Sequence, residues 1–319
     1  MVIKVHTSGF LTTVQDIGRS GYKKFGVPTS GPMDTYALKA ANLLVGNPLS
    51  AAGLEVGVDG PVLSFDEDCL VAVTGAGFEF SVDGCRMPLW TAVFIRRGAY
   101  TRIERTSNGN WAYLAVSGGI KTESVLGSRS TYIKGGFGGH RGAPLNPGDL
   151  LPTEAHISLY FGIAGREIPE DKRPAYIASP LIEVILGPQE QCFTEKGIQT
   201  FLSSTYVVSL KSDRMGYRLE GPKIDHQNSA DILSDGMLFG SVQVPASGQP
   251  IVMMSEHPTT GGYTKIATVV SADLPILAQC EPGVSQVRFK ATTVDAAQKR
   301  YRRMLSWLDE DTMETEEDA

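Results

Sequence analysis

The sequence lacks closely spaced cysteines and histidines. The four cysteines, Cys69, Cys85, Cys192 and Cys280, lie far apart and match no CxxC spacing. Isolated cysteines in a chain of 319 residues are typical of buried apolar positions in a cytosolic protein. The five histidines include no pair at metal-ligand spacing, and no HExxH sequence occurs. The sequence therefore predicts neither a disulfide framework nor a metal site.

Common catalytic and targeting signals are also missing. There is no G-x-G-x-x-G fingerprint, no G-x-x-x-x-G-K-[ST] loop and no G-x-S-x-G elbow, so no dinucleotide site, P-loop or serine nucleophile is predicted. The first residues, MVIKVHTSGF, lack the apolar segment of a signal peptide. No window approaches the 18 apolar residues of a membrane span. We expect a cytoplasmic protein that does not contact a membrane and is not a self-contained enzyme of these classes.

The negative charge of the chain is concentrated at one end. The formal net charge is −6, and residues 309–319 carry seven acidic side chains and no basic one. Such a segment is typical of a solvated, disordered terminus. The remainder is close to neutral and shows no basic face, so nucleic acid is not an expected partner.

What the sequence contains favours β-structure. Its 35 glycines and 18 prolines predict frequent turns, and short apolar runs at 69–73, 89–95 and 111–116 alternate with turn residues. The dipeptides Asp59-Gly60 and Asp83-Gly84 each predict a strand–turn–strand unit. Regular βαβ alternation is absent, which disfavours a Rossmann sheet. The predicted fold is mainly β, a barrel-like architecture with a few peripheral helices.

The first predicted helix follows the sequence SGPMD. Ser30 or Gly31 is its expected cap, Pro32 suits the first helical position, and Asp34 faces the positive end of the helix dipole. A short helix is expected near residues 193–202.

The chain divides most naturally at residues 165–180, a polar segment rich in proline. The predicted organisation is a β-rich half with glycine-rich loops at 1–165, a β-rich barrel half at 181–290, a C-terminal helix at 291–308 and the acidic tail at 309–319.

Two glycine-containing segments in the first half are candidate binding loops. Residues 12–34 place Gln15, Asp16 and Arg19 before a helix start, an arrangement that can receive a carboxylate or phosphate, or can simply be a structured loop. Residues 117–142 place Arg129 and Tyr132 before four glycines that surround Phe137. This segment is either a ligand-facing loop or a hairpin whose glycines satisfy turn geometry.

Two further candidates lie in the second half. Arg214 and Arg218, at even spacing on a predicted strand, can present two guanidinium groups to a carboxylate, or can be surface arginines paired with nearby acids. Ser234 and Asp235 follow in another glycine-containing turn. The segment 255–265 predicts a compact polar loop between apolar strands, and its candidate residues are Thr259, Thr260, Gly261, Gly262, Tyr263 and Lys265.

Taken in order, these segments resemble a known family. The sequences TTVQDIGRSGYKKFGVPTSGPMD, ANLLVGNP, LAVSGGI, LGSRSTY with GGFGG, DRMGYRLEG, SDGM, GSVQVP, TTGGYTKIATV and SADLP are similar to the hallmarks of a family that comprises the C subunits of bacterial 5-oxoprolinase, KipA and allophanate hydrolase subunit 2, and that is related to biotin-dependent carboxyltransferases. The similarity runs from about Thr12 to Arg288. One departure is SEHP, where members more often have Asp and Gln, and it argues against a direct role for Glu256 or His257.

The resemblance implies a cyclophilin-like β-barrel in a protein that acts with partners. In the 5-oxoprolinase interpretation, a KipI-like B subunit and the A subunit of 5-oxoprolinase join this chain, and the complex uses ATP to convert 5-oxoproline to glutamate. Arg129, Arg214 or Arg218 would then hold the substrate carboxylate, and backbone N–H groups of the TTGG segment would face an amide oxygen. The sequence does not identify a catalytic residue.

Two other interpretations stay open. The chain could belong to a biotin-dependent urea or amide carboxylase as its carboxyltransferase-type component, with biotin on a separate carrier because no attachment sequence occurs here. It could also be a KipA-like binding protein that counters a KipI-type inhibitor of a histidine kinase. Fold resemblance alone does not choose between them.

Overall fold

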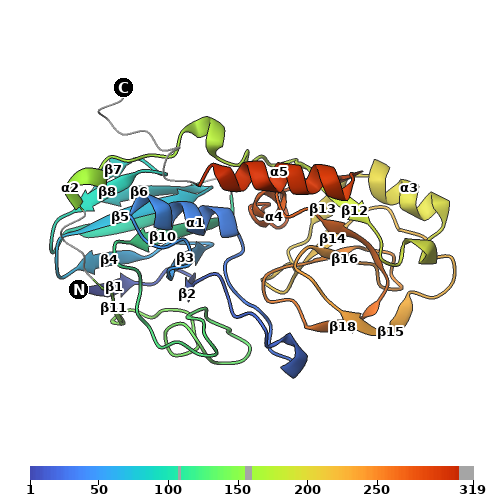
Figure 1. Ribbon diagram of the computed structural model, residues 1–319, viewed down its shortest axis with the longest axis horizontal. Helices are drawn as coiled ribbons and strands as arrows, with labels where there is room; N and C mark the ends of the chain where they lie inside the picture. Colours follow the sequence, from blue (N-terminus) through green and yellow to red (C-terminus); the bar gives the residue numbers. More distant parts are fainter. Residues whose placement is uncertain (107–108, 155–159, 309–319) are drawn as a thin grey trace. The chain divides into compact units, whose positions relative to one another are not determined.

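The computed structural model describes residues 1–106, 109–154 and 160–308 (Figure 1). The chain forms two compact units. Unit 1 comprises Met1–Arg19, Ser30–Pro174 and the chain from Ser306 onward, and unit 2 comprises Ser20–Thr29 and Ala175–Leu305. The change of unit between Pro174 and Ala175 lies within the segment 165–180. Each predicted half is one continuous stretch of sequence. In the structure, Ser20–Thr29 belong to unit 2 although they lie within the predicted first half. The predicted acidic tail lies outside the described residues.

Unit 1 contains two antiparallel sheets within the described residues. The first has six strands in the order β11 (Leu150–Pro152), β1 (Val2–Thr7), β4 (Val62–Phe65), β9 (Tyr100–Arg105), β6 (Phe78–Val82) and β7 (Cys85–Met87). The second has five strands in the order β2 (Leu11–Gln15), β3 (Gly53–Gly57), β10 (Trp111–Val116), β5 (Cys69–Gly75) and β8 (Ala92–Ile95). Apolar side chains from both sheets, including Ile3, Phe80, Leu54 and Leu114, form one core.

The two sheets differ in how deeply their strands are buried. Every residue of β3, β5 and β10 is buried, whereas β9 alternates between exposed and buried positions. The helix α1 (Thr35–Leu44) contacts β10 and β5 and covers the face of the five-stranded sheet that is turned away from the core (Figure 1). Continuous apolar runs are the expected sequence of strands covered on both faces. A short helix, α2 (Tyr160–Ile163), follows β11 in the described chain.

The start of α1 differs from the predicted one. The cap is Asp34, whose backbone is extended and whose carboxylate accepts a hydrogen bond from Ala37 N at 2.9 Å. The cap residue must have non-helical backbone angles and an acceptor near the third following N–H, and Asp34 supplies both. Ser30, Gly31 and Pro32 therefore precede the helix.

Both predicted strand–turn–strand units are confirmed, although only one of the two turns joins strands that pair with each other. Asp83 and Gly84 both adopt positive φ angles, 47° and 81°, and join the paired strands β6 and β7. Asp59 and Gly60 instead connect β3 to β4, which belong to different sheets. An Asp-Gly pair marks a turn, but whether the flanking strands pair depends on the rest of the core.

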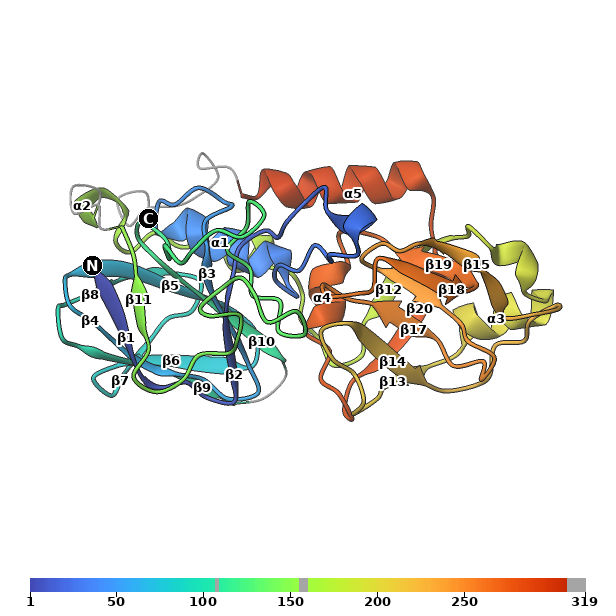
Figure 2. The same ribbon diagram turned by 90° about the horizontal axis from the view of Figure 1, so that it is seen from below.

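Unit 2 is built on a closed barrel of seven strands within the described chain. The order is β12 (Leu181–Leu186), β19 (Lys265–Val269), β16 (Ser241–Gln243), β17 (Ile251–Met253), β14 (Gly216–Glu220), β13 (Tyr206–Val208) and β20 (Gln286–Ala291) (Figure 2). The parallel pairing of β20 with β12 closes it. The predicted mainly β architecture with a barrel is confirmed for this unit, whereas unit 1 is a pair of stacked sheets.

Three helices of unit 2 accompany the barrel. They are α3 (Glu195–Ser203), α4 (Leu274–Ala278) and α5 (Val294–Ser306). Arg300 of α5 reaches the carboxylates of Glu183 and Asp273 at 3.1 and 2.5 Å. Within the described residues, no helix is long and apolar enough to cross a membrane.

The predicted polar loop at 255–265 is partly a strand. Thr260–Tyr263 form β18, which pairs with β15 (Asp231–Gly236) in a two-stranded ribbon. The backbone of the TTGG sequence is therefore engaged in a ladder. The glycines fit there because Gly261 faces Gln243: a Cβ on Gly261 would lie 2.5 Å from the Gln243 side-chain amide.

The prediction of buried cysteines holds for two residues. Cys69 and Cys280 are buried, and burial raises the pKa of the Cys280 thiol to about 12. Cys85 is exposed on the short strand β7, and Cys192 is half-buried. The prediction is therefore wrong for Cys85, whose position on β7 faces away from the core.

Candidate functional site

Asp16 organises the glycine-rich loop of unit 1. Its buried carboxylate accepts hydrogen bonds from Ser128 Oγ at 2.5 Å, Ser130 Oγ at 2.7 Å, Arg129 N at 2.5 Å and Gly18 N at 2.9 Å. Each hydrogen bond to a charged group contributes about 1.5–3 kcal/mol to stability. Because four donors occupy the carboxylate, Asp16 positions the loop and is not available to a ligand.

Arg19 and Gln15 attach the same loop from the other side. Arg19 is 1% exposed, and its guanidinium donates to Ser30 Oγ at 3.0 Å and to the Ser130 carbonyl. The guanidinium also lies 5.0 Å from the ring centre of Phe137, a cation–π contact. Gln15 is fully buried and donates to the Thr131 carbonyl at 3.3 Å. Both predicted anion-binding residues thus bind protein groups.

The glycines after the loop allow close packing of backbone on backbone. Gly138 has φ of 73°, and a Cβ there would lie 2.1 Å from the Ser130 carbonyl oxygen. Gly139 has φ of 56°, and its Cβ would lie 1.8 Å from Thr131 Oγ1. These two positions require glycine both for their angles and for their space.

Arg129 and Tyr132 have defined neighbours in this loop. Arg129 is half-buried, and its Nε donates to the Thr122 carbonyl at 2.9 Å. Tyr132 packs edge-on against Phe137 with ring centres 5.5 Å apart. Arg129 therefore connects the Asp16 network to residue 122.

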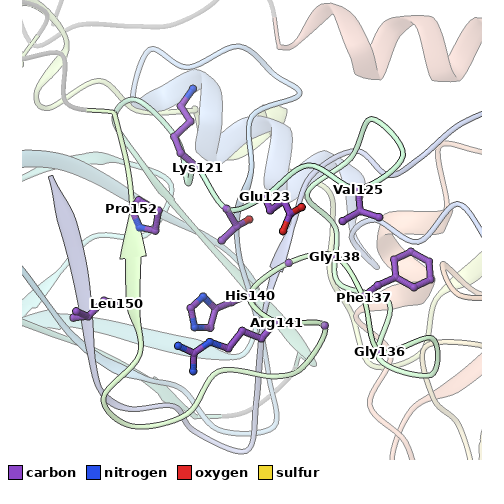
Figure 3. Close-up of a pocket in the computed structure, with 13 residues that line it drawn as sticks. Lys121, Glu123, Val125, Gly136, Phe137, Gly138, His140, Arg141, Leu150 and Pro152 are labelled. Atoms are coloured by element: carbon purple, nitrogen blue, oxygen red, sulfur yellow. The ribbon is translucent and has the colours of Figure 1, made fainter.

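A cavity of about 530 Å³ opens beside these residues in unit 1 (Figure 3). Its volume lies in the usual range for small-molecule sites, roughly 300–1,000 Å³. The lining residues are Lys121, Thr122, Glu123, Val125, Gly136, Phe137, Gly138, Gly139, His140, Arg141, Gly142, Leu150 and Pro152. Basic, acidic and hydroxyl groups therefore share one space with an apolar part.

Unit 2 contains a buried ion pair. Arg214 Nε donates to Glu256 Oε1 at 2.8 Å, and the two side chains are 6% and 4% exposed. Arg218 lies on β14 and is exposed, whereas Arg214 precedes that strand. The prediction that both arginines share one side of a strand is wrong because β14 begins only at Gly216.

His257, which follows Glu256 in the sequence, contacts Lys23. Lys23 Nζ lies 3.4 Å from His257 Nε2 and 3.2 Å from the Met237 carbonyl oxygen. His257 Nδ1 lies 2.8 Å from the Pro258 carbonyl oxygen, which requires the hydrogen on Nδ1. Burial lowers the pKa of both Lys23 and His257. The imidazole is therefore kept neutral, with its Nε2 lone pair toward the lysine.

Lys265 and Asp235 form the polar side of the β15–β18 ribbon. The Lys265 side chain is buried and its Nζ lies 2.5 Å from the exposed carboxylate of Asp235. The hydrogen bond from Lys265 lowers the pKa of Asp235. Gln243 donates to the Tyr263 carbonyl at 3.2 Å. The ribbon is thus attached to the barrel by lysine and glutamine side chains.

The remaining ribbon candidates are arranged along its edge. Ser234 and Thr260 are exposed, Gly262 is half-buried, and the Thr259 carbonyl accepts from Met237 N at 3.0 Å. Among the residues that the structure describes, no three His, Cys, Asp or Glu side chains are grouped so as to hold a metal ion.

A family model for the carboxyltransferase domain, subdomains A and B, matches residues 25–291 of this chain. The chain belongs to this carboxyltransferase domain family.

The relatives of this carboxyltransferase domain include two proteins of similar length. This chain is 36% identical to the C subunit of the Haemophilus influenzae 5-oxoprolinase, over 93% of this chain and 94% of that protein. It is also 36% identical to the C subunit of the Escherichia coli 5-oxoprolinase, over 96% and 98%. Among solved structures, the K. lactis urea amidolyase superimposes with a TM-score of 0.90 at 28% identity, covering 97% of this chain and 20% of that one.

Sequence reasoning missed part of the carboxyltransferase domain's polar chemistry. The departure of SEHP from the family pattern predicts no direct role for Glu256 or His257, yet both are buried and make specific polar contacts. Lys23 contacts His257 across 234 positions of sequence, and no local pattern signals that pairing. Thr122, His140 and Arg141 lie in or beside the predicted glycine-rich loop, so its composition was the available signal.

Proposed function

We propose that this chain is the C subunit of an ATP-dependent 5-oxoprolinase, which acts with the A and B subunits to convert 5-oxo-L-proline to L-glutamate. The observation that carries the proposal is the match to two 5-oxoprolinase C subunits over almost their whole length. A match of 36% that covers 93% of this chain and 94% of the relative supports the same role better than a match to one part of a larger protein.

The geometry supports a role in binding and orienting. Asp16, Arg19 and Arg214 are each committed to buried protein partners. The chain instead offers a lined cavity in unit 1 and a neutral histidine beside Lys23 in unit 2. In this proposal ATP is a substrate of the assembled complex, and the complex works in the cytoplasm, where ATP is available. The family also implies that the barrel of unit 2 is cyclophilin-like, which superposition on a cyclophilin would test.

A second candidate function is carboxyl transfer to urea or a related amide. It is favoured by the superposition on K. lactis urea carboxylase, with a TM-score of 0.91 over 97% of this chain. The carboxylated biotin would come from a separate carrier, because this chain has no attachment sequence.

The test is reconstitution with each component omitted in turn. The purified chain is mixed with the A and B subunits, ATP and 5-oxo-L-proline, and glutamate is measured. We expect glutamate only from the complete mixture. If associated, folded subunits yield none, while urea and a carboxylated biotin carrier yield carboxylated urea, the second function replaces the first.

A further inference from the structure

The cavity of unit 1 contains a buried hydroxyl that the protein does not use. Thr122 is 7% exposed, and within the described chain its Oγ1 has no hydrogen-bond partner. Buried polar atoms are almost always paired, so an isolated one in a cavity wall calls for a ligand group. Thr122 is also held in place, because its carbonyl accepts from Arg129 Nε at 2.9 Å. The unused atom therefore belongs to a fixed residue of the cavity wall and lies just beneath the wall's surface.

A basic pair occupies another part of the same cavity (Figure 3). His140 Nε2 and Arg141 Nη1 lie 3.2 and 3.8 Å from Asp149 Oδ1. The other oxygen of Asp149 accepts from Asn146 N at 2.7 Å, which fixes the carboxylate. Asp149 thus attracts two nitrogen-bearing side chains to one place on the cavity wall, and His140 Nε2 makes no hydrogen bond within the described chain.

The conformation of Arg141 is unusual for its residue type. Its φ angle is 58°, in the left-handed region that favours glycine, and the following Gly142 has φ of 71°. The pair forms the tip of a tight turn closed by the bridge between His140 and Ala143. An arginine in a strained position is a reason to look for a function of its side chain. The guanidinium is 81% exposed and can reach a ligand at the cavity mouth.

Glu123 adds an acidic group to the lining. Across the residues with assigned positions, its carboxylate has no ion-pair partner, and Glu123 lines the same cavity as His140 and Arg141 (Figure 3). The cavity is consequently neither uniformly basic nor uniformly acidic, which suits a ligand with a carboxylate and a nitrogen group.

We propose that this cavity binds 5-oxo-L-proline, with its carboxylate on Arg141 and His140 and its lactam group hydrogen-bonded to Thr122 Oγ1. The proposal rests on the proposed function, which supplies a substrate with one carboxylate and one lactam. A guanidinium recognises a carboxylate in a planar, two-point manner, and a hydroxyl can either accept from a lactam N–H or donate to its carbonyl. After the ring opens, the freed ammonium of glutamate would face Glu123.

The test measures binding to the full-length chain by titration calorimetry and ligand-observed NMR. Three ligands separate the two recognition elements: 5-oxo-L-proline, 2-pyrrolidinone, which has the lactam without the carboxylate, and L-glutamate. We expect 2-pyrrolidinone to bind at least tenfold more weakly than 5-oxo-L-proline. Glu123→Gln should weaken glutamate binding more than 5-oxo-L-proline binding.

Two variants remove one contact each without disturbing the fold. Thr122→Val replaces a hydroxyl that bonds nothing in the described part of the protein, and Arg141→Gly introduces the residue that prefers its backbone angle. Each variant should weaken the binding of 5-oxo-L-proline at least tenfold and leave the midpoint of thermal unfolding unchanged. Arg141→Gly should leave the binding of 2-pyrrolidinone unchanged. Arg86→Gln, which removes an exposed arginine of the same unit, is the control and should bind like the wild type.

The results distinguish this site from the proposed function. Glutamate formation by the complex with normal KM in both cavity variants would overturn the site and leave the function standing. Binding that depends on Thr122 and Arg141 in a chain whose complex forms no glutamate would support the site and overturn the function. Absence of saturable binding to the wild-type chain would also overturn the site.

Discussion

Lys23 Nζ lies 3.4 Å from Nε2 of His257, and the two residues are 234 positions apart in sequence. The other ring nitrogen of His257 faces the Pro258 carbonyl at 2.8 Å, so the imidazole is hydrogenated on Nδ1 and accepts at Nε2. Burial is the main cause that lowers the pKa of His257, and the positive charge of Lys23 lowers it further. Unit 2 therefore holds a neutral histidine next to a lysine.

This pair predicts a loss of stability on acidification. A histidine whose pKa is lower in the folded state contributes stability above its unfolded pKa, ordinarily 6.5, and that stability is lost as the pH falls through the lower folded value. Thermal unfolding of the wild type should therefore shift to lower temperature below about pH 6.5. In Lys23→Met, the NMR titration of His257 should move to higher pH and the acid-dependent loss should shrink. A His257 titration unchanged by Lys23→Met would contradict the contact.

The buried Arg214–Glu256 pair predicts strongly non-additive mutations. Replacing Arg214 by Met leaves a carboxylate that is 4% exposed without its cation. Breaking such a pair costs about 3–5 kcal/mol, whereas replacing both partners with apolar residues is often close to neutral. Urea unfolding of Arg214→Met, Glu256→Met and the double variant should show the double variant to be more stable than either single one.

The exposed pair Arg86–Glu79 is the control for that cycle. Its side chains are 75% and 42% exposed, so its coupling should lie between about 0 and 1 kcal/mol. Equal coupling in the two cycles would show that burial of Arg214 and Glu256 does not determine their interaction.

The ribbon of β15 and β18 predicts that replacing Lys265 changes the titration of Asp235. Asp235 is exposed, and the hydrogen bond from Lys265 is the first cause of its lowered pKa. In Lys265→Met the pKa of Asp235 should rise toward 3.8, its ordinary value. Carboxyl carbon NMR across an acid titration measures this directly. Amide exchange at Gly261 should become faster in the same variant, because the lysine also donates to the Gly236 carbonyl.

Local chemistry made part of this structure predictable from sequence. The Asp83-Gly84 turn was predictable because both positive φ angles are set within the dipeptide. The last helix was expected within 291–308 and is found at Val294–Ser306 because its apolar spacing is regular. The turn at Asp59-Gly60 was predictable too, but not the sheets it connects, because the chain leaves one sheet for the other there and that path depends on the shared core of both sheets.

The candidate site was predictable in position more than in role. Glycine density singles out residues 117–142, and residues 121–123, 125 and 136–142 of this segment line the cavity. The roles of Asp16 and Arg19 followed only from three-dimensional contacts, because a free and a fully bonded carboxylate have the same sequence signal. TTGG looked like a loop because its pairing partner β15 lies about 30 residues away in the chain, beyond any local pattern.

The glycine-rich loop gives a matched test of space against backbone angle. Gly127 and Gly138 have similar φ angles, 77° and 73°, so Ala at either position suffers the left-handed cost of roughly 1–2 kcal/mol. Gly127 has nothing within 4 Å of an added Cβ, whereas at Gly138 the Cβ would lie 2.1 Å from the Ser130 carbonyl oxygen. Gly138→Ala should therefore lower the free energy of unfolding by several kcal/mol more than Gly127→Ala, on the order of a strongly destabilising core change.

Because Ser130 also donates to Asp16, the displaced carbonyl should loosen the Asp16 network and weaken ligand binding in the neighbouring cavity. Equal unfolding free energies for the two alanine variants would show that the loop can move away from Gly138, and that the Asp16 network does not hold the cavity wall rigidly.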